Sequence, residues 1–148
     1  MSSAIRPIAI GIFRCDDRIL VGHGHDVLKG ERFCRPPGGA IEFGERTAEA
    51  LRREIREEVR AEIAEPHLLA VLESTFALEG VPMHELVFVF EARFLDTHFY
   101  QLPQVAVYEP GWDGHLTWEL LDWFRGGPMP LYPDGLLQLL NEGWLTTV

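Results

Sequence analysis

The 148-residue chain has little cysteine and few basic residues, and both shortages exclude classes of protein. Its two cysteines, Cys15 and Cys34, are too few for a disulfide framework and do not form a CxxC pair. Thirteen Lys and Arg stand against 23 Asp and Glu, and the resulting net charge of −10 disfavours binding to DNA or to anionic membranes. We therefore expect neither a nucleic acid nor a membrane as partner.

Long hydrophobic runs are also absent. No stretch approaches the roughly 20 apolar residues of a membrane span, and the N-terminal MSSAIRPIAI lacks the apolar run of a signal peptide. With 47% hydrophobic residues and no repeat or linker, a chain of this length can bury one sizeable core. We expect a single domain over residues 1–148 in a soluble, cytoplasmic protein.

What the sequence does contain is a cluster of carboxylates at helical spacing. Glu54, Glu57 and Glu58 stand at i, i+3 and i+4, and such positions share one narrow sector of a helix surface. Neighbouring like charges repel one another, and a divalent cation held among them offsets that repulsion. The preceding PPGG lets the backbone approach the same place. This pattern indicates a magnesium site on a helix.

Another face of this helix is apolar, at spacings of 3, 4 and 4: Ala48, Leu51, Ile55 and Val59. We expect a helix over residues 47–60 with Thr47 as its N-cap. A plainer interpretation is that REIREE forms an ordinary exposed face, and that the arginines of this stretch pair with its acids.

The longer pattern favours the metal site, because it resembles the Nudix box GX5EX7REUXEEXGU, in which U is an aliphatic residue. Gly39 is followed after five residues by Glu45, and after seven more by REIREE, which spans residues 53–58. The match fails at Arg60, where the family has a glycine. Either Arg60 adopts a left-handed conformation at a cost of about 1 kcal/mol, or the helix continues a little further.

The resemblance implies a fold, a reaction and a set of site residues. The fold is an α/β/α sandwich with a mixed sheet between helices, and the reaction is metal-dependent hydrolysis of a nucleoside diphosphate linked to another group X. By resemblance, Glu54, Glu57 and Glu58 bind Mg²⁺, or Mn²⁺ in its place, and the Gly38 carbonyl completes the coordination. In the family, the counterparts of Glu45 and Arg53 orient this cluster through a salt bridge.

The segments FCRPPGGAIEFGE and GGPMPLYPDGLLQLL are similar to bacterial Nudix proteins of the ADP-ribose pyrophosphatase-like branch. Substrates of the implied kind include ADP-ribose, sugar nucleotides and nucleoside triphosphates. The alternative is a nucleotide-sensing module without activity, although non-catalytic relatives usually lose box glutamates and this chain keeps all four. Homodimers are frequent in the family, so a homodimer also stays open.

Several further residues are candidates for substrate contact or proton transfer. Many Nudix enzymes carry an acid before a Trp of the penultimate strand, but Thr117 precedes Trp118 here. Three nearby acids could take the place of this missing carboxylate: Glu109, Asp113 and Glu119. Glu109 is preferred because it lies in a loop. His115 titrates in a range suited to acid–base chemistry. Arg35 could meet a substrate phosphate or form a surface ion pair. His23 and His25 are more simply explained as exposed residues than as ligands.

The remaining sequence predicts further strands and one more helix. We expect strands at residues 8–13, 18–21, 31–35, 40–42, 68–78, 85–94 and 115–120, and a closing helix at 132–142. The apolar run at 85–94 is typical of a central strand. Residues 23–30 are expected to form a polar loop. The aromatic residues of an irregular region at 96–114 could stack on a base or pack on their own domain.

Overall fold

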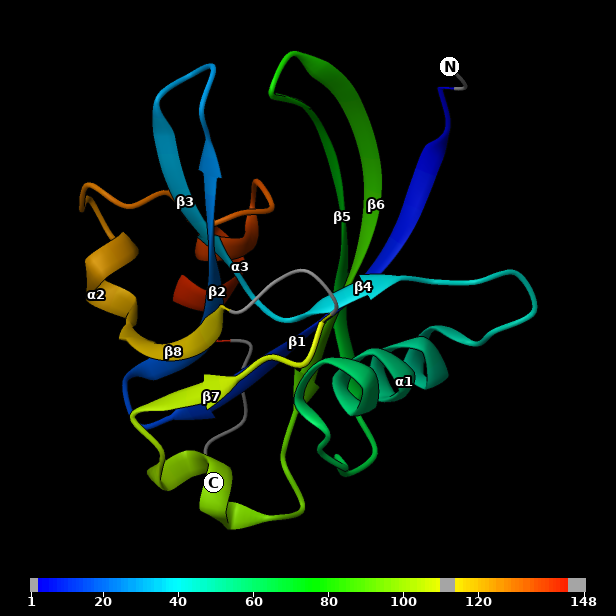
Figure 1. The fold of residues 1–148 in the computed structure, drawn as a ribbon, viewed down its shortest axis with the longest axis vertical. Coiled ribbons are helices and arrows are strands. Elements are labelled where there is room, and N and C mark those ends of the chain that lie inside the picture. Colours follow the sequence, from blue (N-terminus) through cyan, green and yellow to red (C-terminus); the bar gives the residue numbers. More distant parts are fainter. Residues whose placement is uncertain (1–2, 110–113, 144–148) are drawn as a thin grey trace.

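The computed structural model describes residues 3–109 and 114–143, and a mixed sheet lies at its centre (Figure 1). In spatial order the sheet contains β5 (His67–Leu78), β6 (Val81–Ala92), β1 (Ile5–Cys15), β2 (Arg18–Asp26), β8 (His115–Leu120) and β7 (Gln104–Ala106). Two short strands branch from it: β3 (Glu31–Arg35) pairs with β2, and β4 (Gly38–Ala40) pairs with β1. Strands β1 and β6 are parallel, and the other paired strands are antiparallel.

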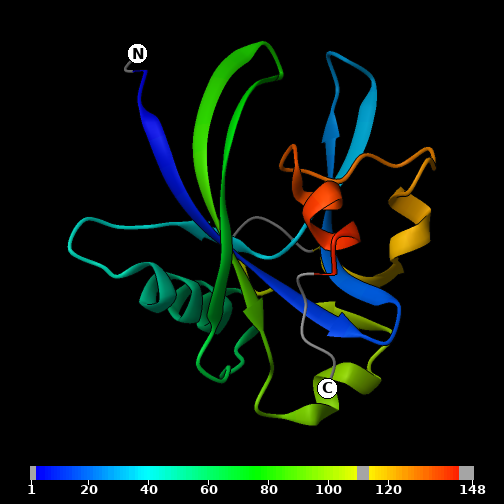
Figure 2. The same ribbon diagram turned by 180° about the vertical axis from the view of Figure 1, so that it is seen from behind.

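Helices cover both faces of this sheet. The helical elements in the described part of the chain are α1 (Thr47–Val59), the 3₁₀ helix η1 (Thr97–Gln101), α2 (Leu121–Phe124) and α3 (Leu136–Asn141). Helix α1 lies in front of the sheet in Figure 1, whereas α3 lies in front in the reverse view of Figure 2. The predicted α/β/α sandwich with a mixed sheet is confirmed.

The side chains of β1 point alternately to the two faces of the sheet, and this alternation explains the two apolar clusters of the core. Ala9 and Phe13 belong to the apolar cluster that contains the buried residues of α1. Ile8, Ile10 and Ile12 belong to a second cluster with the buried residues of α2 and α3. Because successive side chains of a strand point to opposite faces, one strand buries apolar groups in both cores.

The predicted polar loop at residues 23–30 is wrong in its first half, because β2 continues to Asp26 and pairs with β3. The strand projects beyond the core there, so its side chains lack the apolar alternation on which the prediction depended. At the tip, the buried Asp26 carboxylate accepts hydrogen bonds from the backbone N–H groups of Lys29 (3.1 Å) and Glu79 (2.9 Å). Asp26 therefore fastens the β2–β3 turn to the β5–β6 turn.

The region at residues 96–114 is more regular than expected, since it contains η1 and β7. Phe99 stacks on Phe94 with 4.7 Å between ring centroids, and Tyr100 lies 5.5 Å from Trp118. These two aromatic residues pack on their own core. Of the other two aromatic residues of the region, Tyr108 lies against the Arg60 guanidinium, and Trp112 lies outside the described residues.

At the C-terminal end, the predicted helix at 132–142 starts too early. Helix α3 begins at Leu136, after a cis Tyr132–Pro133 bond and a Gly135 with a φ of 88°. The short α2, which follows β8 directly, was not predicted. No helix in the described part of the chain is both long enough and apolar enough to cross a membrane.

Candidate active site

The orientation of α1 is set by its apolar stripe. The buried residues of the helix are Ala50, Leu51, Ile55 and Val59, and Ala48 is only partly buried. This burial leaves Glu54, Glu57 and Glu58 on another side of the helix. The helix begins at Thr47, as predicted, but the N-cap assignment to Thr47 is wrong, because Arg46 occupies the N-cap without a side-chain cap bond.

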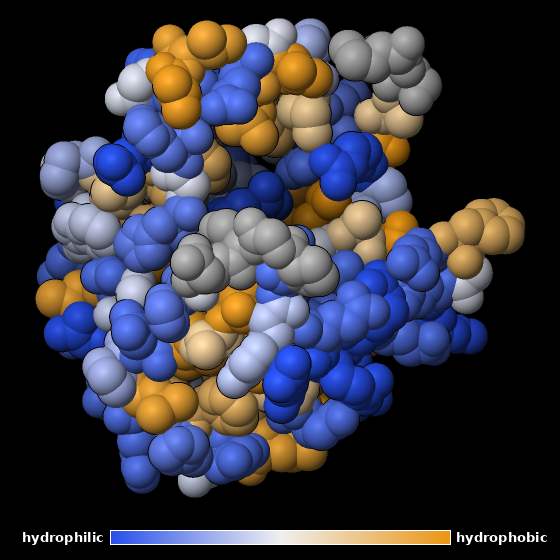
Figure 3. Space-filling model, viewed as in Figure 1, coloured by the Kyte–Doolittle hydropathy of each residue, from blue (hydrophilic) through white to orange (hydrophobic). Residues whose placement is uncertain are grey.

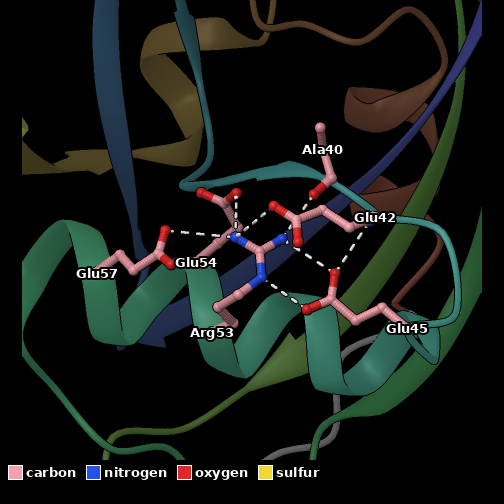
Figure 4. Close-up of polar contacts among 6 residues, drawn as sticks. All are labelled: Ala40, Glu42, Glu45, Arg53, Glu54 and Glu57. Atoms are coloured by element: carbon pink, nitrogen blue, oxygen red, sulfur yellow. Dashed lines mark hydrogen bonds and ion pairs between the residues drawn. The ribbon is translucent and has the colours of Figure 1, made fainter.

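Arg53 is the centre of a polar network that joins α1 to the loop before it and to β4 (Figure 4). Its guanidinium donates to both carboxylate oxygens of Glu45, at 2.6 and 3.0 Å. It also donates to Glu54 at 2.9 Å, to Glu57 at 3.3 Å and to the Ala40 carbonyl at 2.9 Å. These hydrogen bonds lower the pKa of Glu45 and raise the pKa of Arg53. The predicted Glu45–Arg53 salt bridge is present in the structure.

The two glycines before the loop are required by crowding. A Cβ on Gly39 would lie 2.5 Å from the carboxyl carbon of Glu54, so the Glu54 carboxylate rests directly on the Gly39 backbone. Gly38 has a φ of 150°, and a Cβ there would overlap the Ala9 carbonyl oxygen in β1. Any larger residue at Gly39 would displace Glu54, which gives a physical reason for the first glycine of the pattern.

Glu58 lies in a different electrostatic setting from Glu45. It is partly buried, and burial, followed by the negative charge of Glu54, raises its pKa to about 8. Glu109 and Glu57 add to this rise. Among the described residues, no Arg or Lys forms an ion pair with Glu58. The described part of the chain therefore supplies no Arg or Lys that would stabilise an ionised Glu58.

The carboxylate oxygens at this site are the hard ligands that Mg²⁺ and Mn²⁺ prefer. In the described part of the chain, however, no three acidic, His or Cys side chains are placed so that they enclose an ion. The contacts of Arg53 explain this geometry, because they hold the carboxylates of Glu54 and Glu57. The residue types fit a divalent cation, provided that these two side chains turn from Arg53 toward it.

A cleft of about 520 Å³ opens beside Glu58. Besides Glu58 and His23, its lining includes three residues that the sequence singled out, namely Gly38, Glu109 and Arg35. Of the proposed replacement acids, Glu109 thus lies with Glu58, whereas Glu119 accepts a hydrogen bond from Thr117 at 2.7 Å and does not line the cleft. Asp113 lies outside the described residues.

Of the remaining candidate residues, some line the cleft and others lie on the surface outside it. Arg35 forms an ion pair of 3.5 Å with the buried Glu85. His115 is exposed at the start of β8 and does not line the cleft. His23 lines the cleft, but its two ring nitrogens lie 2.7 Å from Thr117 Oγ1 and 3.5 Å from Cys34 Sγ. Cys34 is buried, as predicted, and burial raises the pKa of its thiol to about 12.

The departure from the box at Arg60 has a local solution. Helix α1 ends at Val59, and Arg60 takes the left-handed conformation with φ 57° and ψ 41°. Its guanidinium lies 3.9 Å from the ring centroid of Tyr108, and the Tyr108 N–H donates to the Glu58 carbonyl at 2.6 Å. These contacts attach the segment before Glu109 to the end of α1. Arg52 and Arg56 pair with acids, as the ion-pairing interpretation predicts.

Comparison with known proteins places this fold and site in one family. The NUDIX domain matches residues 5–119, which is more than half of the chain. A MutT NUDIX hydrolase from Burkholderia pseudomallei is 26% identical, with a TM-score of 0.62 over 93% of this chain and 98% of that one.

Two further solved structures have the same fold at lower identity. A MutT protein from Bacillus halodurans is 19% identical, with a TM-score of 0.64 over 96% of this chain and 84% of that one. An ADP-ribose pyrophosphatase from Streptococcus suis is 15% identical, with a TM-score of 0.56 over 98% and 96% of the two chains. The chain therefore belongs to the Nudix family and is a Nudix hydrolase.

Proposed function

We propose that this Nudix hydrolase is a metal-dependent pyrophosphohydrolase. Its substrate is a nucleoside diphosphate linked to a group X, as in ADP-ribose, a sugar nucleotide or a nucleoside triphosphate. The observation that carries the proposal is the position of the Glu54 carboxylate against Gly39, beside Glu58, which pairs with no Arg or Lys of the described residues. Such a group of carboxylates suits a divalent cation next to a cleft.

In this proposal, Glu54, Glu57 and Glu58 hold the cation, and the Gly38 carbonyl supplies a further oxygen. Bound Mg²⁺, or Mn²⁺, would neutralise the diphosphate and lower the pKa of a water molecule. Arg53 keeps its paired hydrogen bonds to Glu45 while Glu54 and Glu57 turn away from it. Glu45 and Arg53 thus position the site without meeting the substrate.

The cleft supplies the other roles. Arg35 lines it and offers a guanidinium, which matches the geometry of a phosphate group. Glu58 and Glu109 both face it, and either carboxylate could accept a proton from the attacking water. The net charge of −10 makes a cation necessary as well, because the protein would otherwise repel an anionic substrate.

The test is a substrate panel incubated with Mg²⁺, with products separated by chromatography. The panel contains ADP-ribose, sugar nucleotides, dinucleoside polyphosphates, nucleoside triphosphates and oxidised nucleotides. We expect turnover of at least one compound, and its loss in a chelator and in Glu57→Gln. If no compound of the panel is hydrolysed while nucleotides still bind, the result would contradict the proposal and favour a nucleotide-sensing module.

Three more general features also stay proposals. We take residues 1–148 as one domain, because the described helices and strands pack around one shared sheet. Homodimers are frequent in the family, so a dimer is an outcome to test by light scattering. The cytoplasm remains the compartment predicted from the sequence.

A further inference from the structure

A second pocket lies between the β2–β3 and β5–β6 hairpins, where the space-filling view is hollowed (Figure 3). Its volume is about 190 Å³. Pockets that enclose a whole drug-sized ligand measure roughly 300–1,000 Å³. This pocket therefore suits one part of a nucleotide rather than an entire nucleotide.

The floor of the pocket is a polar row across three strands. Glu85 of β6 is paired with Arg6 of β1 and with Ser74 of β5, and directly paired residues face the same side of a sheet. The next row toward the core is apolar, with Val87 and its neighbour Ile8. Glu85 and Ser74 are only 3% and 4% exposed, so a carboxylate and a hydroxyl group are buried at the edge of an apolar layer.

Aromatic and other apolar side chains form part of the walls, beside the charged residues Asp26, Lys29 and Asp134. Phe76 and Met83 form the next row outward on the same face as Glu85. On the other side, the rings of Phe33 and Tyr132 lie 5.3 Å apart, and the Tyr132 hydroxyl donates to Glu31 at 2.6 Å. Aromatic faces around a polar floor suit a planar ring with polar edges.

The pocket adjoins the cleft at Glu58. Phe33, Arg35 and Leu78 line both cavities, and Arg35 forms an ion pair with Glu85 of the pocket. A nucleotide whose phosphates lie near Glu58 and Arg35 can therefore place another part of the same molecule in the pocket.

A purely structural role explains Glu85 poorly. A buried ion pair often contributes no more stability than apolar residues of similar volume. The ion pairs of Glu85 measure 3.5 Å to Arg35 and 3.8 Å to Arg6, whereas a charge-assisted hydrogen bond measures about 2.7–2.9 Å. Its carboxylate thus keeps the capacity to accept hydrogen bonds from a ligand in the pocket.

We propose that this pocket binds the nucleobase of the substrate and prefers bases with a ring N–H next to a carbonyl, such as guanine and uracil. The Glu85 carboxylate accepts from the ring N–H, and the neighbouring Arg6 donates to the carbonyl. Adenine and cytosine present an unprotonated ring nitrogen at that position, and it would repel the carboxylate. This inference rests on the proposed function and narrows its substrate class.

The test is calorimetric titration of the full chain with GMP, UMP, AMP and CMP in Mg²⁺. We expect GMP and UMP to bind about tenfold more tightly than AMP and CMP. In Glu85→Gln that preference should fall below about threefold, because an amide can both donate and accept. A matched control is Glu73→Gln, whose carboxylate is exposed on β5 and pairs with His84. It should keep the preference of the native chain.

Equal binding of the four nucleotides, no binding of any, or an unchanged preference in a folded Glu85→Gln would overturn the inference. Thermal melting of each variant verifies that it is folded. Monophosphates contain no diphosphate bond, so this result does not depend on hydrolysis. Failure of the pyrophosphohydrolase proposal would appear separately, as absence of turnover in the substrate panel.

Discussion

Glu58 and Glu85 are two carboxylates withdrawn from solvent, and the charges around them differ in sign. The neighbours of Glu58 are the acids Glu54 and Glu109, which help to raise its pKa to about 8. The neighbours of Glu85 are two arginines, Arg6 and Arg35. We propose that Glu58 takes a cation from outside the chain, whereas Glu85 has two arginines beside it. In these proposals, the residues around each glutamate distinguish a metal site from a recognition site.

The largest expected difference between the two carboxylates is in turnover. Glu58→Gln should lower kcat by several orders of magnitude, because an amide replaces a charged ligand of the cation. The fold should persist in chelator, since the amide, like the protonated Glu58 of the metal-free chain, carries no charge beside Glu54. Steady-state kinetics and thermal melting measure the two effects. Full activity of Glu58→Gln would mean that the Glu58 carboxylate is not a ligand of the cation.

Displacement of the Glu54 carboxylate from the Gly39 backbone should have the next largest effect on turnover. Gly39→Ala should lower turnover by about 100-fold, because the new methyl group displaces the Glu54 carboxylate and shifts of about 1 Å cost this much in an active site. Circular dichroism should show that α1 remains folded. Native activity of Gly39→Ala would mean that the position of Glu54 is not critical.

Substitution of Glu85 should change KM rather than kcat. Glu85→Leu should raise KM for the best substrate about tenfold, since the base loses its acceptor, and leave kcat within about twofold. Its free energy of unfolding should fall by no more than about 2 kcal/mol, because Arg6 and Arg35, which lose their partner, are 48% and 35% exposed and can be hydrated. A large loss of stability with native KM would make Glu85 a structural residue instead.

The smallest expected effect is a pH dependence of the metal-free protein. The pKa of Glu58 is about 8 in the folded chain, against an ordinary value of 4.5. Between these values the unfolded chain loses its proton while the folded chain keeps it, so stability should fall as pH rises from 4.5 to 8. Melting in chelator should show a decrease of a few degrees. The decrease should be smaller in Glu58→Gln, and an equal decrease would assign it to other groups.

The two carboxylates also differ in how far the sequence could reveal them. Glu54, Glu57 and Glu58 lie within five consecutive residues of one helix, so their proximity follows from helical periodicity alone. Glu85 meets Arg6 and Ser74 only through pairing of β6 with β1 and β5, and no local pattern specifies that register. The site on α1 was therefore predictable, whereas the second pocket was not.

A similar distinction applies to the fold. The apolar runs predicted β6 as a central strand and β8 with its observed bounds, because burial leaves a pattern in the sequence. The predictions for the outer half of β2 and for the start of α3 were wrong. The exposed outer half of β2 and the turn at Gly135 leave a weaker pattern in the sequence. The contact of Arg60 with Tyr108 likewise depends on two distant segments.

The central claim is that the carboxylates of α1 bind a divalent cation, and Mn²⁺ binding followed by electron paramagnetic resonance tests it most directly. Titration of Mn²⁺ with the native chain should deplete the signal of free Mn²⁺. Glu54→Gln and Glu58→Gln should bind at least about tenfold more weakly, whereas the control Glu73→Gln should match the native chain. Equal depletion by all four proteins would contradict the account.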